Sequence, residues 1–302
     1  MLSEPIRTSG PPSNWEHREL YDNIKDAIYA LPDRFKSDLS LFGILTTDLY
    51  TLASALGASI EQSVVDNLNL LRTVWDMEDK YHAYQFIRQP QVFPDVRLQD
   101  HNGNVIMGIE LKGWFALAKE GEPSFRYSVS PNVCSAADLM VVFPWILSEV
   151  ISGVPRLLMP FVEEAKYAAE WRNYYWQIMR GRSGDEAEII FAEANAPYPR
   201  KNDRFNDSPK KDAGKNFGRV SRSRIMDDFI EEMMKRPISG IPLLAWHKFI
   251  KIFSDQQTEE NIERILNAIE KEFESQIIEK EKAKEAFEKL RESAINLLHS
   301  LS

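Results

Sequence analysis

The sequence predicts a protein of the mixed α and β class (α/β or α+β), and three stretches with different patterns support this prediction. Residues 1–86 repeat apolar positions every three or four residues, which is the period of an amphipathic helix. Residues 91–165 instead hold short apolar runs separated by turn residues, a pattern typical of strands. Helical patterns return at 163–180 and again beyond residue 222. We therefore expect helices, then strands, then helices along the chain.

Three helices are expected before the strands. The first covers about 15–31, the second covers about 38–56, and the third begins after Ser59 and continues through Trp75. Glu61 suits the first turn of this third helix, because acidic side chains are favourable near a helix N-terminus. Residues 1–86 are therefore expected to be entirely helical apart from their connections.

Two strands joined by a tight turn are expected next. Val92–Leu98 and Val105–Leu111 are apolar runs, and Asn102-Gly103 lies between them. This dipeptide is a strong hairpin signal, because both residues readily adopt the positive φ angles of a two-residue turn. Further strands are expected at Phe125–Val129, Leu139–Leu147 and Arg156–Val162.

Helices are expected again in the second half of the chain. Glu163–Arg180 predicts a helix with an aromatic face, which core packing explains better than base stacking. Shorter helices are expected at 222–235 and 241–253, and a long charged helical region follows Ser254. That region carries two apolar stripes, Ile262, Ile265, Leu266, Ile269 and Phe273, then Phe287, Leu290, Ala294, Leu297, Leu298 and Leu301. The charged residues 279–285 between the stripes form a solvent-facing span or a bend, and could equally support a dimer interface.

The composition is that of an ordinary globular protein, with 43% hydrophobic and 27% charged residues. The formal net charge of −9 gives no global electrostatic argument for nucleic-acid binding. The charge is unevenly distributed, however, since residues 199–224 carry a net charge of +6 and the remainder carries −15. This segment has almost no apolar residues, so alone it is expected to be a mobile loop. It is either a solvated surface loop or a segment that becomes ordered on phosphates.

Other classes of protein are not expected from this sequence. The N-terminus has no apolar stretch suited to a signal peptide, and the longest apolar run, Leu139–Leu147, is far shorter than the roughly 20 residues of a spanning helix. We therefore expect a cytoplasmic protein without a membrane span. The single cysteine, Cys134, cannot form an internal disulfide and is expected to be buried rather than nucleophilic. The five histidines are too scattered to suggest a zinc site.

One group of residues combines several features of a catalytic site. Pro94-Asp95 lies at the start of the first expected strand, and Glu110-Leu111-Lys112 lies at the end of the next. Because side chains alternate along a strand, Glu110 and Lys112 share one face. The hairpin through Asn102-Gly103 folds Asp95 back towards Glu110.

Two neighbouring carboxylates and a lysine suit the hydrolysis of a phosphodiester. Asp95 and Glu110 supply the hard oxygen ligands that Mg²⁺ prefers. The bound metal would neutralise phosphate charge and lower the pKa of a water molecule. Lys112 on the same face would orient or deprotonate that water and stabilise the developing negative charge. The alternative is a cross-strand salt bridge on an exposed sheet face, which contributes little to stability.

These motifs resemble those of the PD-(D/E)xK nuclease superfamily, to which many type II restriction endonucleases belong. Pro94-Asp95 matches the PD element and Glu110-Leu111-Lys112 the (D/E)xK element. The resemblance implies a mixed central sheet flanked by helices, with a restriction-endonuclease-like core and large helical additions. It also implies Mg²⁺-dependent cleavage of double-stranded DNA, usually by a homodimer. In that superfamily an acidic residue from a preceding helix often joins the site, a place that Glu78 or Asp79 could fill.

The resemblance suggests how the chain is organised. Residues 1–86 would be an N-terminal helical region, 87–198 the nuclease core, and 199–302 a basic loop with a C-terminal helical region, all within one compact domain. Candidate base readers are Arg200, Lys201, Asn202 and Arg204. Candidate phosphate contacts are Lys210, Lys211 and Lys215.

A second acid-x-Lys sequence and two other functions remain open alternatives. Glu164-Ala165-Lys166 follows Asp138, but it begins an expected helix, where residues two apart point in different directions. Glu163 and Glu164 are more simply acids of a first helical turn. A sequence-specific type II restriction enzyme is the leading hypothesis. The alternatives are a structure-specific repair or recombination nuclease, and a non-catalytic helical interaction protein.

Overall fold

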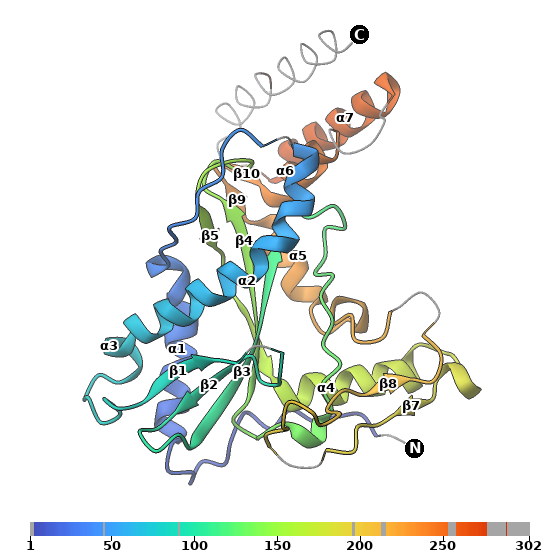
Figure 1. Ribbon diagram of the computed structural model, residues 1–302. Helices are drawn as coiled ribbons and strands as arrows, with labels where there is room; N and C mark the ends of the chain where they lie inside the picture. The colour runs from blue at the N-terminus through green and yellow to red at the C-terminus, as the bar shows by residue number, and fades with distance from the viewer. Residues whose placement is uncertain are drawn as a thin grey trace.

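The computed structural model describes residues 3–44, 46–89, 91–194, 197–212, 216–252, 258–276 and 288. Its helices and strands combine into a mixed α/β fold, as the sequence predicts (Figure 1). The helices are α1 (Arg18–Arg34), α2 (Thr46–Leu70), α3 (Arg72–Trp75), α4 (Ala165–Tyr174), α5 (Asp227–Lys235), α6 (Leu243–Lys251) and α7 (Glu259–Gln276). The strands of the main sheet are β1 (Gln85–Arg88), β2 (Val96–Gln99), β3 (Val105–Phe115), β4 (Leu139–Leu147), β5 (Pro155–Leu157) and β6 (Phe161–Glu164). Two short two-stranded ladders pair β7 (Ile189–Ile190) with β8 (Ser208–Pro209), and β9 (Pro237–Ile238) with β10 (Ile241–Pro242).

The main sheet is mixed. Its strands run in the order β1-β2-β3-β4-β5, and β6 also pairs with β4. The first three strands form an antiparallel meander, β3 and β4 are parallel, and both β5 and β6 run antiparallel to β4. Between β2 and β3 the chain turns at residues 100–104, where the Asp100 carboxylate accepts hydrogen bonds from the backbone N–H groups of Asn102 and Asn104. The hairpin expected at Asn102-Gly103 is therefore confirmed.

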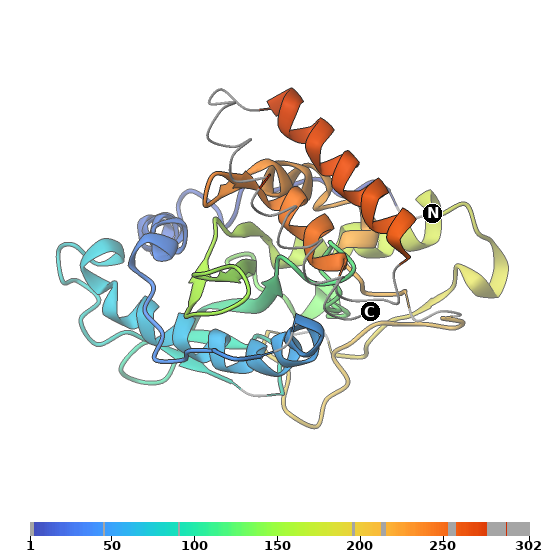
Figure 2. The same cartoon turned by 90° about the horizontal axis from the view of Figure 1, so that it is seen from above.

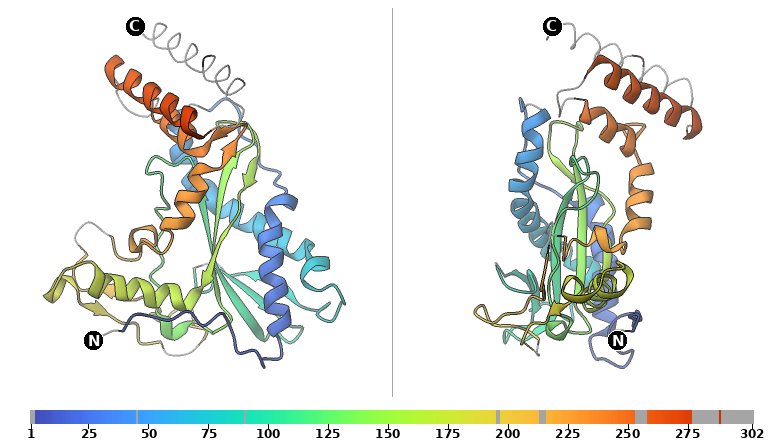
Figure 3. Two further views of the ribbon diagram at one scale, coloured as in Figure 1. Left: turned by 180° about the vertical axis from the view of Figure 1, so that it is seen from behind. Right: turned by 90° about the vertical axis from the view of Figure 1, so that its right-hand side faces the viewer.

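Helices cover both faces of the sheet. Viewed from above and from the side, α2 lies on one face, while α5 and α6 lie on the other (Figures 2 and 3). Every residue of β4 is buried, as expected for a continuous apolar strand covered on both faces. One large apolar core extends from Leu20 in α1 to Ile250 in α6, so the N-terminal and C-terminal helices pack into the same core as the sheet.

The N-terminal region differs from the sequence prediction in two places. The expected second and third helices are one continuous helix, α2, which passes through Gly57. A Cβ atom on Gly113 of β3 would lie 3.9 Å from the Gly57 Cα, an ordinary van der Waals distance, so α2 and β3 are neighbours at this point. Residues 38–44 are not helical, and β1 begins at Gln85, inside the region expected to be helical.

The strand predictions between residues 125 and 164 are only partly correct. Phe125–Val129 forms isolated bridges, with Arg126 paired to Arg219 and Val129 to Asn206, rather than a strand of the sheet. The expected strand Arg156–Val162 is divided into β5 and β6. Glu163 and Glu164 end β6 instead of forming a first helical turn, because both pair with β4.

The remaining helices are largely where the sequence predicts them. The helix expected at Glu163–Arg180 is observed as α4, which continues as a π-helical turn over Tyr175–Met179. In α7, Ile262, Leu266 and Ile269 are buried and Ile265 is partly buried, which confirms these four positions of the first apolar stripe. The second stripe and the charged residues 279–285 lie outside the described residues. None of the helices in the described part of the chain is long and apolar enough to span a membrane.

Candidate active site

The candidate site lies where β3 extends beyond β2. Strand β2 begins at Val96, which pairs with Ile109, so the rest of β3 has only β4 as a sheet neighbour. Asp95 immediately precedes β2, and its carboxylate accepts a hydrogen bond from the Leu111 backbone N–H at 3.1 Å. The Asp95 side chain thus satisfies a backbone donor of β3 that β2 is too short to reach.

Lys112 joins the two carboxylates that the sequence predicts to be neighbours. Its Nζ atom lies 2.8 Å from Asp95 Oδ2 and 2.8 Å from Glu110 Oε1. The two carboxylates therefore face a single cation. The side chains are largely enclosed, with 25% of Asp95, 9% of Glu110 and 17% of Lys112 exposed. This enclosure differs from an exposed surface salt bridge.

Burial and charge act in opposite directions on these groups. Burial raises the pKa of Glu110 to about 7; the Lys112 ammonium opposes this shift and the Asp95 carboxylate adds to it. Burial disfavours the charged form of Lys112, but attraction to Glu110 and Asp95 outweighs it and raises the pKa of Lys112 above its ordinary value. Lys112 is therefore positively charged at neutral pH and better suited to stabilising negative charge than to accepting a proton.

A third carboxylate, Glu61 of α2, lies near this group. Burial raises the pKa of Glu61, the Lys112 ammonium lowers it and the Asp95 carboxylate raises it, which places Glu61 within electrostatic reach of both. Its carboxylate also lies 3.3 Å from the Arg88 guanidinium on β1. From the sequence, Glu61 is expected in the first turn of a helix, whereas it lies in the interior of α2. The spacing in the sequence does indicate that Glu61 faces the protein interior. Val64, Val65 and Leu68 follow it by three, four and seven residues, so they share its helix face, and all three are buried.

Glu78 and Asp79 do not supply this third carboxylate. Glu78 is 71% exposed, and its carboxylate pairs with Lys80 at 3.0 Å. Asp79 follows it in a turn, with a positive φ of 56°. The structure therefore gives Glu78 an ion pair away from the Lys112 ammonium, and it does not support the prediction that Glu78 or Asp79 joins the site. The short helix α3 ends at Trp75, so Glu78 and Asp79 lie in a turn rather than on a helix that faces the sheet.

The competing acid-x-Lys sequence does not form a site of this kind. Glu164 accepts hydrogen bonds from Thr8 and from the Gly10 backbone N–H. Lys166 is exposed at the start of α4. Asp138, which precedes it in the sequence, is fully buried and accepts hydrogen bonds from three other residues.

Asp138 ties the site to neighbouring segments. Its carboxylate accepts hydrogen bonds at 2.7 Å from the backbone N–H groups of Gly108 and Ser135 and from the Tyr198 hydroxyl. Burial raises the pKa of Asp138 to about 6 against the effect of these donors. Tyr198 also packs near Phe93 and the Arg97 guanidinium, with ring-centroid distances of 6.5 Å and 5.2 Å. The start of the basic segment therefore lies beside the residues that flank Asp95.

The predicted DNA-contacting residues divide into different environments. Arg200, Lys201 and Asn202 are exposed in the turn that follows Tyr198. Arg204 is also exposed and donates a hydrogen bond to the Ser208 hydroxyl at 2.8 Å.

Two of the predicted phosphate contacts are ion-paired instead. Lys210 lies 2.9 Å from Glu188 and 3.2 Å from Asp185, and Lys211 lies 3.6 Å from Asp185. Their positive charge is therefore largely neutralised by neighbouring carboxylates. Lys215 lies outside the described residues.

The basic segment, residues 199–224, forms more contacts with the rest of the protein than its polar sequence predicts. Asp207 is buried and accepts hydrogen bonds from Arg172, Asn173 and the Ala192 backbone N–H. Backbone hydrogen bonds join Asp207 to Ser128 and Phe205 to Ser130. Residues 197–212 are therefore anchored to the rest of the domain through Tyr198, Phe205 and Asp207.

The carboxylate oxygens of the site suit a metal ion that keeps several of its bound water molecules. In the described part of the chain, no three His, Cys, Asp or Glu side chains converge closely enough to hold a metal ion by themselves. Mg²⁺ is commonly bound by only one or two carboxylates together with water and substrate phosphates. Asp95 and Glu110, which already share one cationic group, meet that requirement. No family model, curated protein or solved structure matches this chain.

Proposed function

We propose that this protein is a Mg²⁺-dependent endonuclease that hydrolyses phosphodiester bonds in double-stranded DNA, as a site-specific deoxyribonuclease of the type II restriction class. The observation that carries the proposal is the meeting of Asp95 and Glu110 at the Lys112 ammonium, at the point where β3 extends beyond β2. This combination of two enclosed carboxylates and one cation is suited to holding a metal ion against an anionic phosphate.

Each residue of the site has a distinct role in this proposal. Asp95 and Glu110 would hold Mg²⁺, which supplies charge neutralisation and an activated water. The hydrogen bond from the Leu111 N–H holds the Asp95 carboxylate in its orientation. Lys112 contributes positive charge where the attacked phosphate becomes more negative. Glu61, which is within electrostatic reach of Asp95 and Lys112, would add negative charge beside the metal-holding carboxylates.

DNA as the substrate is supported by charge and by position. The basic turn with Arg200 and Lys201 follows Tyr198, which packs beside the residues flanking Asp95. A duplex that contacts these cations would extend over the candidate site. Such binding should depend on Mg²⁺ and on the basic segment, because the molecule as a whole carries a net charge of −9. A homodimer that cuts a short palindrome is the assembly most compatible with a restriction enzyme.

Digestion of a long unmethylated plasmid, with Mg²⁺ or with EDTA, tests the proposal directly. The wild type should give discrete fragments with Mg²⁺ only, and Lys112→Ala should lose at least about 100-fold in rate because a charged group at the reacting phosphate is removed. Undiminished cutting by Lys112→Ala, or no cutting by the wild type, would overturn the proposal.

Glu61 and Glu78 provide a matched pair of variants. Glu61→Gln should reduce the cleavage rate about 10- to 100-fold, as removal of a group that supports a metal site does. Glu78→Gln should cut like the wild type, because its carboxylate pairs with Lys80. If Glu78→Gln cleaved DNA more slowly than Glu61→Gln, the site would be wrongly assigned.

Two further measurements separate the alternative functions. Smeared products from one duplex, without reproducible ends, would favour a structure-specific nuclease over a restriction enzyme. Calorimetric titration with Mg²⁺ should show binding that Asp95→Asn abolishes. A wild type that neither binds the metal nor cleaves DNA would instead be consistent with a non-catalytic interaction protein.

A further inference from the structure

Arg97 on β2 lies on the same face of the sheet as the candidate active site. Its partner position on β3 is Gly108, two residues before Glu110, whose carboxylate meets Asp95 at the Lys112 ammonium. Because side chains alternate along a strand, positions 108, 110 and 112 share one face, and Arg97 projects from that face with its partner. Two residues of a strand span about 6–7 Å. Along the sheet, Arg97 and Lys112 therefore flank the two carboxylates on opposite sides.

The positive charge of Arg97 is not neutralised by a carboxylate, unlike that of Lys112. Among the described residues Arg97 forms no ion pair, and its guanidinium contacts the Phe93 carbonyl and the Tyr198 ring. Burial lowers the pKa of Arg97, and Tyr198 and Asp138 oppose this shift, but a guanidinium stays protonated in proteins. Asp138 already accepts hydrogen bonds from three other groups. A permanent positive charge therefore remains beside the candidate site.

The contacts of Arg97 hold the guanidinium in place and leave one of its nitrogens available. Nη2 donates a hydrogen bond to the Phe93 carbonyl at 3.2 Å, and the guanidinium lies 5.2 Å from the Tyr198 ring centroid. Nε is enclosed. Nη1 donates to none of the described residues, and Arg97 as a whole is only partly buried. Nη1 is therefore the donor that a ligand can reach, and the planar guanidinium matches the oxygens of a phosphate.

Tyr198 connects Arg97 to the basic turn. Its ring packs on the Arg97 guanidinium, its hydroxyl donates to Asp138 at 2.7 Å, and Arg200 and Lys201 follow it in the exposed turn. Cations are thus placed from the candidate metal site, through Arg97, to the basic turn. A DNA strand that follows this path would meet them with successive phosphates of its backbone.

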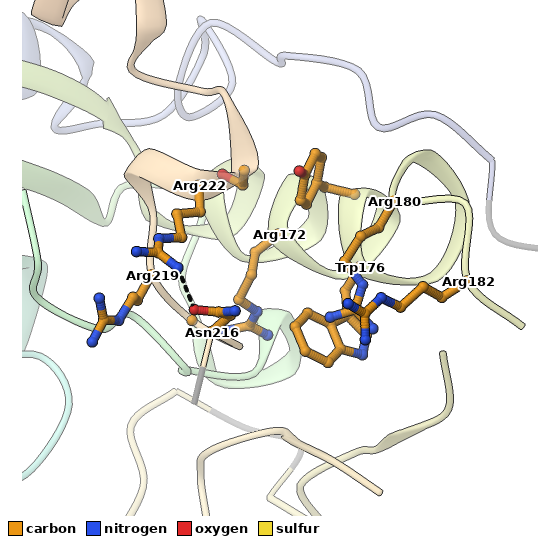
Figure 4. Close-up of a pocket in the computed structure, with 10 residues that line it drawn as sticks. Arg172, Trp176, Arg180, Arg182, Asn216, Arg219 and Arg222 are labelled. Atoms are coloured by element: carbon orange, nitrogen blue, oxygen red, sulfur yellow. Dashed lines mark hydrogen bonds between the residues drawn. The ribbon is translucent and has the colours of Figure 1, made fainter. Parts of the chain in front are cut away.

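The larger group of arginines around Trp176 offers no comparable contact. Arg219 points away from Trp176 and Arg180, and Arg172 and Asn216 lie between them (Figure 4). Arg172 is also buried and ion-paired. These cations do not meet at one phosphate, whereas Arg97 and the candidate metal site share a face of the sheet.

We propose that Arg97 binds the DNA backbone at a phosphate next to the one that is cleaved. This inference rests on the proposed function, which places the cleaved phosphate at Asp95 and Glu110. The neighbouring phosphate fits better than the cleaved one, because Arg97 is displaced by about two strand residues, or 6–7 Å, from the row of these carboxylates. The groups that act on the pKa of Arg97 are Tyr198 and Asp138, which lie toward the basic turn. Arg97 should therefore contribute to DNA affinity more than to the rate of the chemical step.

Duplex binding at several salt concentrations tests this contact, with Ca²⁺ in place of Mg²⁺ and a gel to confirm that the duplex stays intact. Arg97→Gln should bind about tenfold more weakly, and the slope of log affinity against log salt concentration should fall by about 0.9, the value for one phosphate contact. Arg97→Lys keeps the charge and should keep the slope. Arg156→Gln is the matched control, because it removes an exposed arginine of β5, on the other side of β4. With Mg²⁺ and saturating plasmid, Arg97→Gln should cut nearly as fast as the wild type.

A neutral phosphate locates the contact. Once the ends of the plasmid fragments identify the cleaved bond, a duplex is made with a methylphosphonate in place of the phosphate on one side of that bond or on the other. For one of these two duplexes the wild type should lose about tenfold in affinity, and Arg97→Gln should lose little more, because the two changes remove the same interaction. Urea unfolding checks that the variants are folded.

The outcomes separate this inference from the proposed function. If the wild type cleaves DNA but Arg97→Gln keeps the salt slope of the wild type and of Arg156→Gln, the inference is wrong and the proposed function stands. Full affinity of the wild type for both methylphosphonate duplexes would overturn the inference even if Arg97→Gln failed to fold. A wild type that neither binds nor cleaves DNA would overturn both.

Discussion

Gly108 allows the segment that carries Asp95 to lie directly against β3. A Cβ atom at position 108 would lie 2.3 Å from Pro94 Cγ, 2.9 Å from Pro94 Cβ and 2.9 Å from an Asp138 carboxylate oxygen. Carbon atoms in contact are normally about 3.5–4.0 Å apart. In Gly108→Ala, Pro94 must therefore move by more than about 1 Å, and Asp95 must move with it.

The expected effects follow from this displacement. Overpacking of this kind costs about 1–3 kcal/mol of unfolding free energy, and a misplacement of about 1 Å at a catalytic group can cost roughly 100-fold in rate. Gly113→Ala on the same strand is the matched control. Its Cβ would meet Trp145 at 3.7 Å and Gly57 at 3.9 Å, which are ordinary contacts. Because alanine is favoured over glycine within a strand, Gly113→Ala should be more stable than the wild type by about 0.5–1 kcal/mol.

Urea unfolding and plasmid cleavage measure the two effects separately. We expect Gly108→Ala to unfold at a lower urea concentration than the wild type and to cleave DNA more slowly. We expect Gly113→Ala to unfold at the same urea concentration as the wild type or at a higher one. Their stabilities should therefore change in opposite directions. If Gly108→Ala were as stable and as active as Gly113→Ala, the close contact between Pro94 and β3 would not support Asp95, and the reasoning would be refuted.

Three other predictions concern buried polar groups. Tyr198→Phe removes the donor that lies 2.7 Å from Asp138 and should cost about 1–3 kcal/mol in urea unfolding; an unchanged midpoint would contradict this. Burial and then the charge of Lys251 lower the pKa of His247, so the unfolded chain binds a proton first and the unfolding free energy should fall as the pH drops below about 6.5. His247→Gln should show a flatter pH dependence, and equal slopes would argue against this assignment. Burial raises the pKa of the Cys134 thiol, so a thiol reagent should modify it only in urea, not in the native protein.

The fold class and the strongest local patterns were predictable from the sequence. The buried strand Leu139–Leu147 has the bounds that its apolar run indicates, and the turn at Asn102-Gly103 is formed as expected. The patterns that failed depend on tertiary contacts. The break expected between residue 56 and Ser59 does not occur, and α2 continues through Gly57, where it lies beside Gly113 of β3. Propensity is a weak guide wherever such packing decides the structure.

The candidate site was predicted in part. Asp95, Glu110 and Lys112 meet as their spacing around a hairpin indicates. Glu61 was missed, because its distance from Asp95 along the chain says nothing about their distance in space. The sequence signal for Glu61 is its place on the helix face that also carries the buried residues Val64, Val65 and Leu68.

The anchoring of the basic segment has a thermodynamic consequence. Ordering the backbone of one flexible residue costs about 1–2 kcal/mol of conformational entropy. Residues 197–212 are already held by Tyr198, Phe205 and the buried Asp207. A ligand that binds Arg200 and Lys201 therefore restricts mainly their side chains. More of the interaction energy then remains as affinity, and the spacing of these charges is set before the ligand arrives.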